Sequence, residues 1–274
     1  MKNIEISEFC PENLLRRREI EYGTIDRVTY QSTTSEREKR LVVLLPAGYR
    51  ADKKYPVLYC LHGIFGNEET MIGDGNSGLR ILLGNMIADG LAKEMIVVCP
   101  HMYCSKKQPD CTGFDDENTT AYDNIVYELA DDIMPFIAQN YSVATGKKNT
   151  ALCGFSMGGR ETLAVTIARP DLIGYACAIS SAPGIVYAKD SFMEHKGMFS
   201  EDAVSFGAEK PYLLLCCAGD RDSVVGQFPK SYHELLEKNG AEHIWWEIKG
   251  SDHGDPAISS GLYQIFRNSF TEEV

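Results

Sequence analysis

The chain has 274 residues, of which 44% are hydrophobic and 24% are charged, as is ordinary for a globular protein. Because single α/β domains commonly reach about 250 residues, residues 1–274 are interpreted as one domain, with residues 1–24 as an N-terminal extension. The formal net charge of -12 argues against a nucleic-acid partner, whose phosphates would be repelled.

No run of about 18 apolar residues occurs, and the N-terminus has no basic segment followed by an apolar core. We therefore expect no membrane partner and a cytoplasmic location.

Five of the nine cysteines, Cys60, Cys99, Cys153, Cys216 and Cys217, lie in apolar stretches, where thiols behave as small hydrophobic groups. Disulfides are not expected there, and Cys104 with Cys111 lacks the second ligand pair that a zinc site needs, so neither a metal nor a cofactor is predicted.

The first expected strands, residues 25–30 and 41–45, are interpreted as an antiparallel edge of a sheet. Apolar strands at 56–61 and 95–99 follow, and helical patterns occupy the sequence after them, as over residues 125–137. This alternation predicts an α/β fold with a mainly parallel sheet covered by helices on both faces.

The pentapeptide Gly154-Phe155-Ser156-Met157-Gly158 matches the G-x-S-x-G pattern, in which a strand turns sharply into a helix and exposes the central serine. Residues 149–153 before it form an apolar run, as a strand requires. Residues 159–168 after it have helical spacing, and Arg169-Pro170 ends the helix. The context therefore favours Ser156 as a nucleophile.

A serine hydroxyl is a poor nucleophile at neutral pH, so it needs a base and an acid that orients the base. In hydrolases with this elbow the chain order is Ser, then Asp or Glu, then His. An apolar strand at 211–217 leads into a loop with Asp220 and Asp222, and a second strand at 244–248 leads to His253. His253 is the predicted base. Asp222 is the preferred acid because the turn from Gly219 carries it past the strand end, while Asp220 stays an alternative.

The other histidines lack this combination of chain order and strand-end loop. His195 is expected in a polar connecting segment, and a helix is predicted at 230–239, beside His233 and His243. His62 and His101 precede the serine.

An acyl-transfer enzyme also needs donors for the oxyanion that develops in the transition state. One is the backbone N–H of Met157, the residue after the nucleophile. The second is assigned to the Ile64 N–H, in the loop that follows the strand at 56–61. The alternative is that His62-Gly63 is only a tight turn.

These motifs together resemble the esterase D-like branch of the α/β-hydrolases. The resemblance lies in Leu61-His62-Gly63-Ile64-Phe65-Gly66, Asn140-Tyr141-Ser142-Val143, the elbow with Gly159, Gly219-x-x-Asp222-Ser223 and Gly250-Ser251-Asp252-His253. Within the branch the chain is most similar to carbohydrate esterases of the feruloyl and acetyl-xylan type, from about residue 40 to about residue 270.

The resemblance implies an α/β-hydrolase fold and a serine esterase that acts on an acylated carbohydrate or small phenolic ester, with Ser156, Asp222 and His253 as catalytic residues. It also implies oxyanion donation by Ile64 and Met157. The same branch contains S-formylglutathione hydrolases, so a thioester hydrolase is one alternative function. A non-catalytic binding protein on a hydrolase scaffold and an acyltransferase are the others. Residues 102–121 and 187–208 are expected to border the pocket. Because no signal peptide is visible in this sequence, we expect a small imported ester as substrate, and a homo-oligomer stays open.

Overall fold

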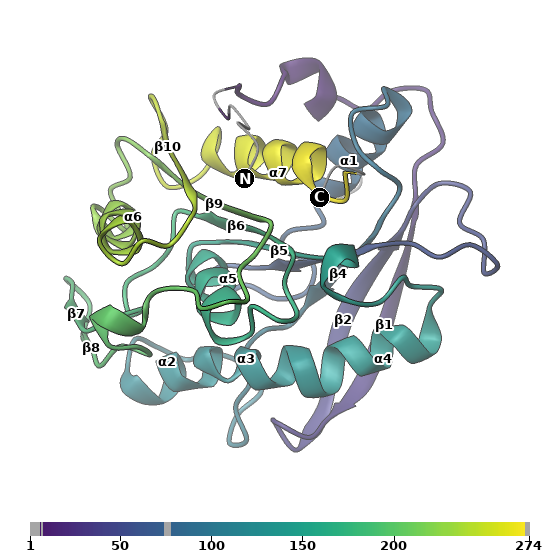
Figure 1. Cartoon of the computed structure of the whole chain (residues 1–274). Helices are drawn as coiled ribbons and strands as arrows, with labels where there is room; N and C mark the ends of the chain where they lie inside the picture. Colours follow the sequence, from purple (N-terminus) through teal and green to yellow (C-terminus); the bar gives the residue numbers. More distant parts are fainter. Residues whose placement is uncertain (1–5, 7, 74–77, 272–274) are drawn as a thin grey trace.

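A computed structural model describes residues 6, 8–73 and 78–271. Across these residues, eight strands form one twisted sheet in the order β1-β2-β4-β3-β5-β6-β9-β10 (Figure 1). The strands are β1 (Thr24–Ser32), β2 (Arg37–Leu45), β3 (Val57–Leu61), β4 (Ile96–Pro100), β5 (Thr150–Phe155), β6 (Tyr175–Ile179), β9 (Leu213–Gly219) and β10 (Ile244–Ile248).

The pairing within the sheet confirms the predicted α/β class. β1 pairs antiparallel with β2, and β2 pairs antiparallel with β4, as expected for the edge. From β4 to β10 every neighbouring pair is parallel. Strands β3, β4 and β6 are buried along their whole length, because helices cover both faces.

The helices divide into two layers (Figure 1). Helices α1 (Leu79–Ala88) and α7 (Ala257–Asn268) lie on one face, where Leu82 and Phe266 join one buried apolar cluster. The other face carries α2 (Asp116–Asp123), α3 (Ile125–Glu128), the π-helical turn η2 (Leu129–Ile133), α4 (Met134–Asn140), α5 (Met157–Ala168) and α6 (Phe228–Lys238). Leu163 of α5 and Leu236 of α6 belong to the second cluster there.

The described part of the N-terminal extension packs on the α1/α7 layer. The Cys10 N–H donates to Ser260 Oγ of α7 at 3.1 Å, and the Phe9 ring meets Trp246 edge-on. The short 3-10 helix η1 (Glu12–Leu15) buries Leu14. These contacts attach the extension to the same globular body.

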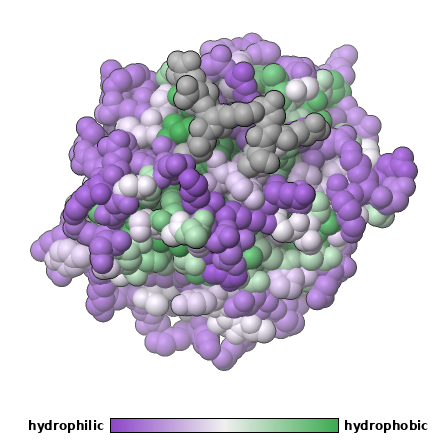
Figure 2. Space-filling view, in the orientation of Figure 1, coloured by the Kyte–Doolittle hydropathy of each residue, from purple (hydrophilic) through white to green (hydrophobic). Residues whose placement is uncertain are grey.

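The surface of the molecule is mostly polar. Polar side chains cover most of the face shown in Figure 2, with small apolar patches between them. Within the described residues, no helix combines the length and apolar character needed to cross a bilayer. All nine cysteines are free thiols.

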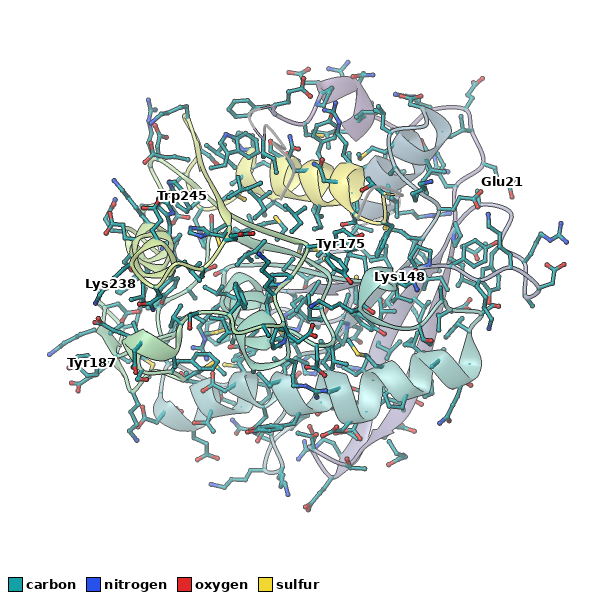
Figure 3. All side chains as sticks on the ribbon, in the orientation of Figure 1. Glu21, Lys148, Tyr175, Tyr187, Lys238 and Trp245 are labelled. Atoms are coloured by element: carbon teal, nitrogen blue, oxygen red, sulfur yellow. The ribbon has the colours of Figure 1, made fainter. Side chains whose placement is uncertain are left out.

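The two segments expected to border the pocket contain short elements that the sequence did not indicate. Helix α2 begins at Asp116, and β7 (Ala188–Lys189) pairs with β8 (Glu194–His195) in a small ribbon. Tyr187, beside this ribbon, projects from the rim of the molecule (Figure 3). His195, expected in a polar connecting segment, lies in β8 of this ribbon, where it is 5% exposed and its Nε2 lies 3.1 Å from Asp190 Oδ2.

Candidate active site

The turn between β5 and α5 presents Ser156. Its backbone has φ 59° and ψ -115°, a strained conformation for a residue with a side chain. The neighbouring glycines permit it: a Cβ on Gly158 would lie 2.3 Å from the Leu61 carbonyl oxygen, and one on Gly154 would lie 2.4 Å from the Gly158 oxygen. The Ser156 N–H donates to the Ile179 carbonyl at 2.9 Å, which ties the turn to β6.

The loop after β10 brings His253 to this serine. His253 Nε2 lies 2.9 Å from Ser156 Oγ, and its Nδ1 lies 2.9 Å and 3.1 Å from the two carboxylate oxygens of Asp222. The Phe155 ring packs against the imidazole, with ring centroids 4.5 Å apart. The structure thus brings together the three residues that the sequence proposed from loops far apart in the chain.

Asp222 is fixed in an orientation suited to receive the imidazole N–H. Its Oδ1 accepts hydrogen bonds from the Val224 and Val225 N–H groups at 3.1 Å and 3.0 Å. Burial opposes ionisation of this carboxyl, but the hydrogen bonds from His253 and Val225 outweigh it and lower the Asp222 pKa. The carboxylate is therefore ionised at neutral pH.

The two competing carboxylates have other partners. Asp220 Oδ1 accepts the Gly250 N–H at 2.7 Å, so Asp220 joins the loops after β9 and β10. Asp252 Oδ1 accepts the N–H and hydroxyl of Ser223 and the N–H of His253. Both shape the loops, and the geometry favours Asp222 over Asp220 as the partner of His253.

The loop after β3 lies against the elbow, since a Cβ on Gly63 would be 3.5 Å from Ser156 Cβ. Within this loop the Phe65 N–H donates to Tyr122 Oη at 3.1 Å and the Gly66 N–H donates to the Gly63 carbonyl at 3.1 Å. These bonds engage the Phe65 and Gly66 amides and do not involve the Ile64 N–H, the donor that the sequence predicts. Met157 is the first residue of α5, where helical N–H groups lack partners within the helix.

Three exposed phenylalanines, one of them in this loop, contact one another. Phe65, Phe114 and Phe192 are 54%, 44% and 55% exposed. The Phe65 and Phe114 rings meet edge-on at 5.2 Å, and Phe114 stacks on Phe192 at 4.7 Å. We call these three residues the aromatic patch. Sequence analysis did not identify them, because they come from three separate loops without any periodic pattern.

Two histidines beside the site are held neutral. Burial, aided by His101, lowers the His62 pKa to about 3, and burial, aided by Lys39, lowers the His101 pKa to about 4. Their rings stack with centroids 5.7 Å apart. In the unfolded chain these two histidines have ordinary pKa values near 6.5. On acidification the unfolded chain therefore binds a proton at each of them before the folded chain does.

We therefore expect the free energy of unfolding to fall as pH drops from about 7 to 5, by about 2 kcal/mol for each of these histidines. Urea titrations at the two pH values measure the change. The His62→Asn variant should lose about 2 kcal/mol less than the wild type over this interval. Equal losses in the two proteins would contradict the prediction.

Taken together, Ser156 Oγ, the His253 imidazole and the Asp222 carboxylate form one chain of hydrogen bonds at the ends of strands β5, β9 and β10. Chemically, this arrangement serves acyl transfer through a covalent intermediate. The sheet order, the strained elbow and the histidine loop after the last strand define an α/β-hydrolase.

Comparison with known proteins then gives the family. Residues 32–273 match the Esterase family model, described as "Putative esterase", and the chain belongs to this family. This confirms the predicted enzyme class, a carboxylic ester hydrolase.

Relatives confirm the resemblance to carbohydrate esterases of the feruloyl type. An endo-1,4-beta-xylanase/feruloyl esterase of Xylanibacter ruminicola is 33% identical over 77% of this chain. Endo-1,4-beta-xylanase Y of Acetivibrio thermocellus is 30% identical over 83% of the chain. The matches cover 26% and 22% of those proteins, so the chain spans about a quarter of their length.

Solved structures agree. A ferulic acid esterase of carbohydrate esterase family CE1 from Anaeromyces mucronatus, in complex with ferulic acid, is 44% identical with a TM-score of 0.93, covering 98% of both chains. An S-formylglutathione hydrolase from Agrobacterium tumefaciens is 16% identical with a TM-score of 0.67, covering 88% of this chain and 92% of that one, and shares the fold alone.

Proposed function

We propose that this protein is a serine esterase that cleaves feruloyl-type esters of carbohydrates, with Ser156, His253 and Asp222 as its catalytic residues. The observation that supports this proposal most directly is the chain of hydrogen bonds from Ser156 Oγ through His253 to Asp222. Support for the aromatic acyl group comes from the Anaeromyces ferulic acid esterase, similar over nearly the whole chain. The aromatic patch adds to this support, because Phe65 lies in the loop after β3, residues 63–66, which we call the oxyanion loop.

In the proposed reaction each step has its own residue. His253 Nε2 takes the proton of Ser156 as Oγ attacks the ester carbonyl, while Asp222 stabilises the imidazolium. The amides of Met157 and Ile64 hold the oxyanion. His253 then protonates the leaving alcohol oxygen of the carbohydrate, and the acyl group stays on Ser156. Water, deprotonated by His253, attacks the carbonyl carbon of this acyl-enzyme. The bond to Ser156 Oγ then breaks, His253 returns the proton to Oγ, and the free acid leaves.

The proposal is tested by comparing kcat/KM for methyl ferulate, 4-nitrophenyl acetate and a matched feruloyl thioester. A clear preference for methyl ferulate over the acetate supports the proposed substrate class. Preference for acetate would replace it with a deacetylase, and preference for the thioester would replace it with a thioester hydrolase. The cytoplasmic location and the small imported ester stay predictions.

The aromatic patch gives a prediction about specificity. Truncating Phe192 to alanine removes one ring of the aromatic patch. If this ring packs on the ferulate ring, the lost aromatic contact costs about 1 kcal/mol of binding. We expect KM for methyl ferulate to rise about fivefold in Phe192→Ala, with kinetics on 4-nitrophenyl acetate unchanged. Tyr127→Ala, which removes an equally exposed ring on α3, is the control and should change neither. Parallel losses on both esters in Phe192→Ala would count against a role in recognising the aromatic acid.

A further inference from the structure

His62 contacts the oxyanion loop through a fixed tautomer. Its ring is buried, with 1% exposure, and Nε2 lies 3.1 Å from the Met102 N–H. Because an amide N–H can only donate, Nε2 accepts and the ring proton resides on Nδ1. Nδ1 lies 2.7 Å from the Gly63 carbonyl oxygen and so donates to it. The lowered pKa keeps this neutral form throughout the working pH range.

That carbonyl shares a peptide plane with the Ile64 N–H. In a trans peptide the C=O and N–H bonds point in opposite directions, so holding the oxygen fixes the direction of the hydrogen. The Gly66 N–H donates to the same Gly63 oxygen at 3.1 Å and reinforces the hold. His62 therefore determines where the Ile64 N–H points without touching it.

The next peptide plane is held from the other side. Tyr122 Oη, on α2 and 1% exposed, accepts the Phe65 N–H at 3.1 Å. Phe65 has φ 61°, which is strained for an aromatic residue and persists only where neighbours hold it. Both peptide planes that flank Ile64 are thus anchored to buried side chains.

Gly66 shows how closely the His62 ring fits this loop. A Cβ there would lie 2.8 Å from His62 Nδ1 and 3.0 Å from the Gly63 oxygen. This close approach leaves no room for a side chain at residue 66. It also shows that the His62 imidazole and the Gly63 carbonyl both pack against the Gly66 backbone.

We propose that His62 and Tyr122 are positioning residues that preorganise the Ile64 N–H for the oxyanion. The inference rests on the proposed function, and it names the side chains that hold the oxyanion loop in position. Preorganised donors stabilise the transition state without reorganising during the reaction, and misplacement by about 1 Å costs up to about a hundredfold in rate.

The two polar contacts of His62 can be separated by substitution. Asparagine places an amide where Nδ1 stood and can still donate to Gly63, whereas glutamine reaches the Nε2 position and keeps only the Met102 contact. We expect His62→Gln to lower kcat for methyl ferulate about 10- to 100-fold with KM within about twofold, and His62→Asn to stay within about fivefold of wild type. The reverse order would show that anchoring Met102 is the important contact and would overturn the proposal.

Tyr122→Phe is the second test variant. It tests the other anchor of the loop and can be measured even if His62→Gln fails to fold. We expect it to lower kcat about three- to tenfold, because the Phe65 N–H loses its acceptor. Tyr30→Phe is the matched control, since it removes a buried hydroxyl bonded to Glu128 at 2.7 Å on the edge strand β1. Equal kcat values in wild type and Tyr122→Phe would overturn the proposal for Tyr122.

Binding of an aryl trifluoromethyl ketone distinguishes this role from a general structural one. The inhibitor forms a tetrahedral adduct whose oxyanion needs the Ile64 N–H, whereas free ferulate does not. Its affinity should fall by the same factor as kcat in His62→Gln, with ferulate affinity unchanged; equal losses for both ligands would contradict the proposal. If Ser156→Ala kept full activity, the proposed function would fail instead, independently of these variants.

Discussion

Replacing Ser156 with alanine is expected to lower kcat for methyl ferulate by a factor on the order of 10⁶, with KM nearly unchanged. Ser156 Oγ is the only protein atom that the mechanism joins covalently to the substrate, and no acyl-enzyme can form without it. The residual rate should be the catalysis that oxyanion binding alone provides.

Steady-state kinetics with purified protein measure this loss, and thermal unfolding checks the fold. Alanine should fit the site, although Ser156 occupies a positive φ that neither residue prefers. Ser231→Ala, which removes an exposed hydroxyl bonded within α6, is the control and should keep wild-type kinetics. An active Ser156→Ala protein would exclude the proposed nucleophile.

Replacing Asp222 with asparagine should lower kcat by about 10³- to 10⁴-fold. The amide keeps the shape of the side chain, but it removes the negative charge beside His253 Nδ1 and can favour the wrong imidazole tautomer. The Val224 and Val225 amides would then also face a weaker acceptor.

Asp220→Asn is the matched control, because Asp220 lies two residues earlier and bonds to the Gly250 N–H. We expect its kcat to stay within about threefold of wild type, because the Gly250 contact needs only an oxygen acceptor. Kinetics of the two variants side by side decide between the carboxylates. A larger loss in Asp220→Asn would reverse the assignment of the acid.

The sequence predicted those parts of the site that depend on local chain signals. The elbow needs glycines within two residues of Ser156, and the strand predicted at 244–248 matches β10 and delivers His253 directly. Strand β9 begins at Leu213, two residues after the predicted start, yet its end still places Asp222 correctly. In each case the neighbours that determine the structure lie close in the chain.

The remaining features depend on contacts between distant segments. Tyr122 and Phe65 are 57 positions apart, and nothing near either residue indicates their hydrogen bond. The aromatic patch joins three loops, and His195 is buried in the small ribbon, where its Nε2 contacts Asp190. The helix after the elbow starts at Met157 and not at Gly159, because the sharp turn makes Ser156 its N-cap.

The central claim is that the acyl group of a feruloyl ester passes through a covalent bond to Ser156. The most direct test is peptide mapping by mass spectrometry after acid quenching of the enzyme during turnover of methyl ferulate. We predict a feruloyl adduct on the peptide that contains Ser156, absent from Ser156→Ala. An adduct on another residue, or rapid turnover by Ser156→Ala, would contradict the account.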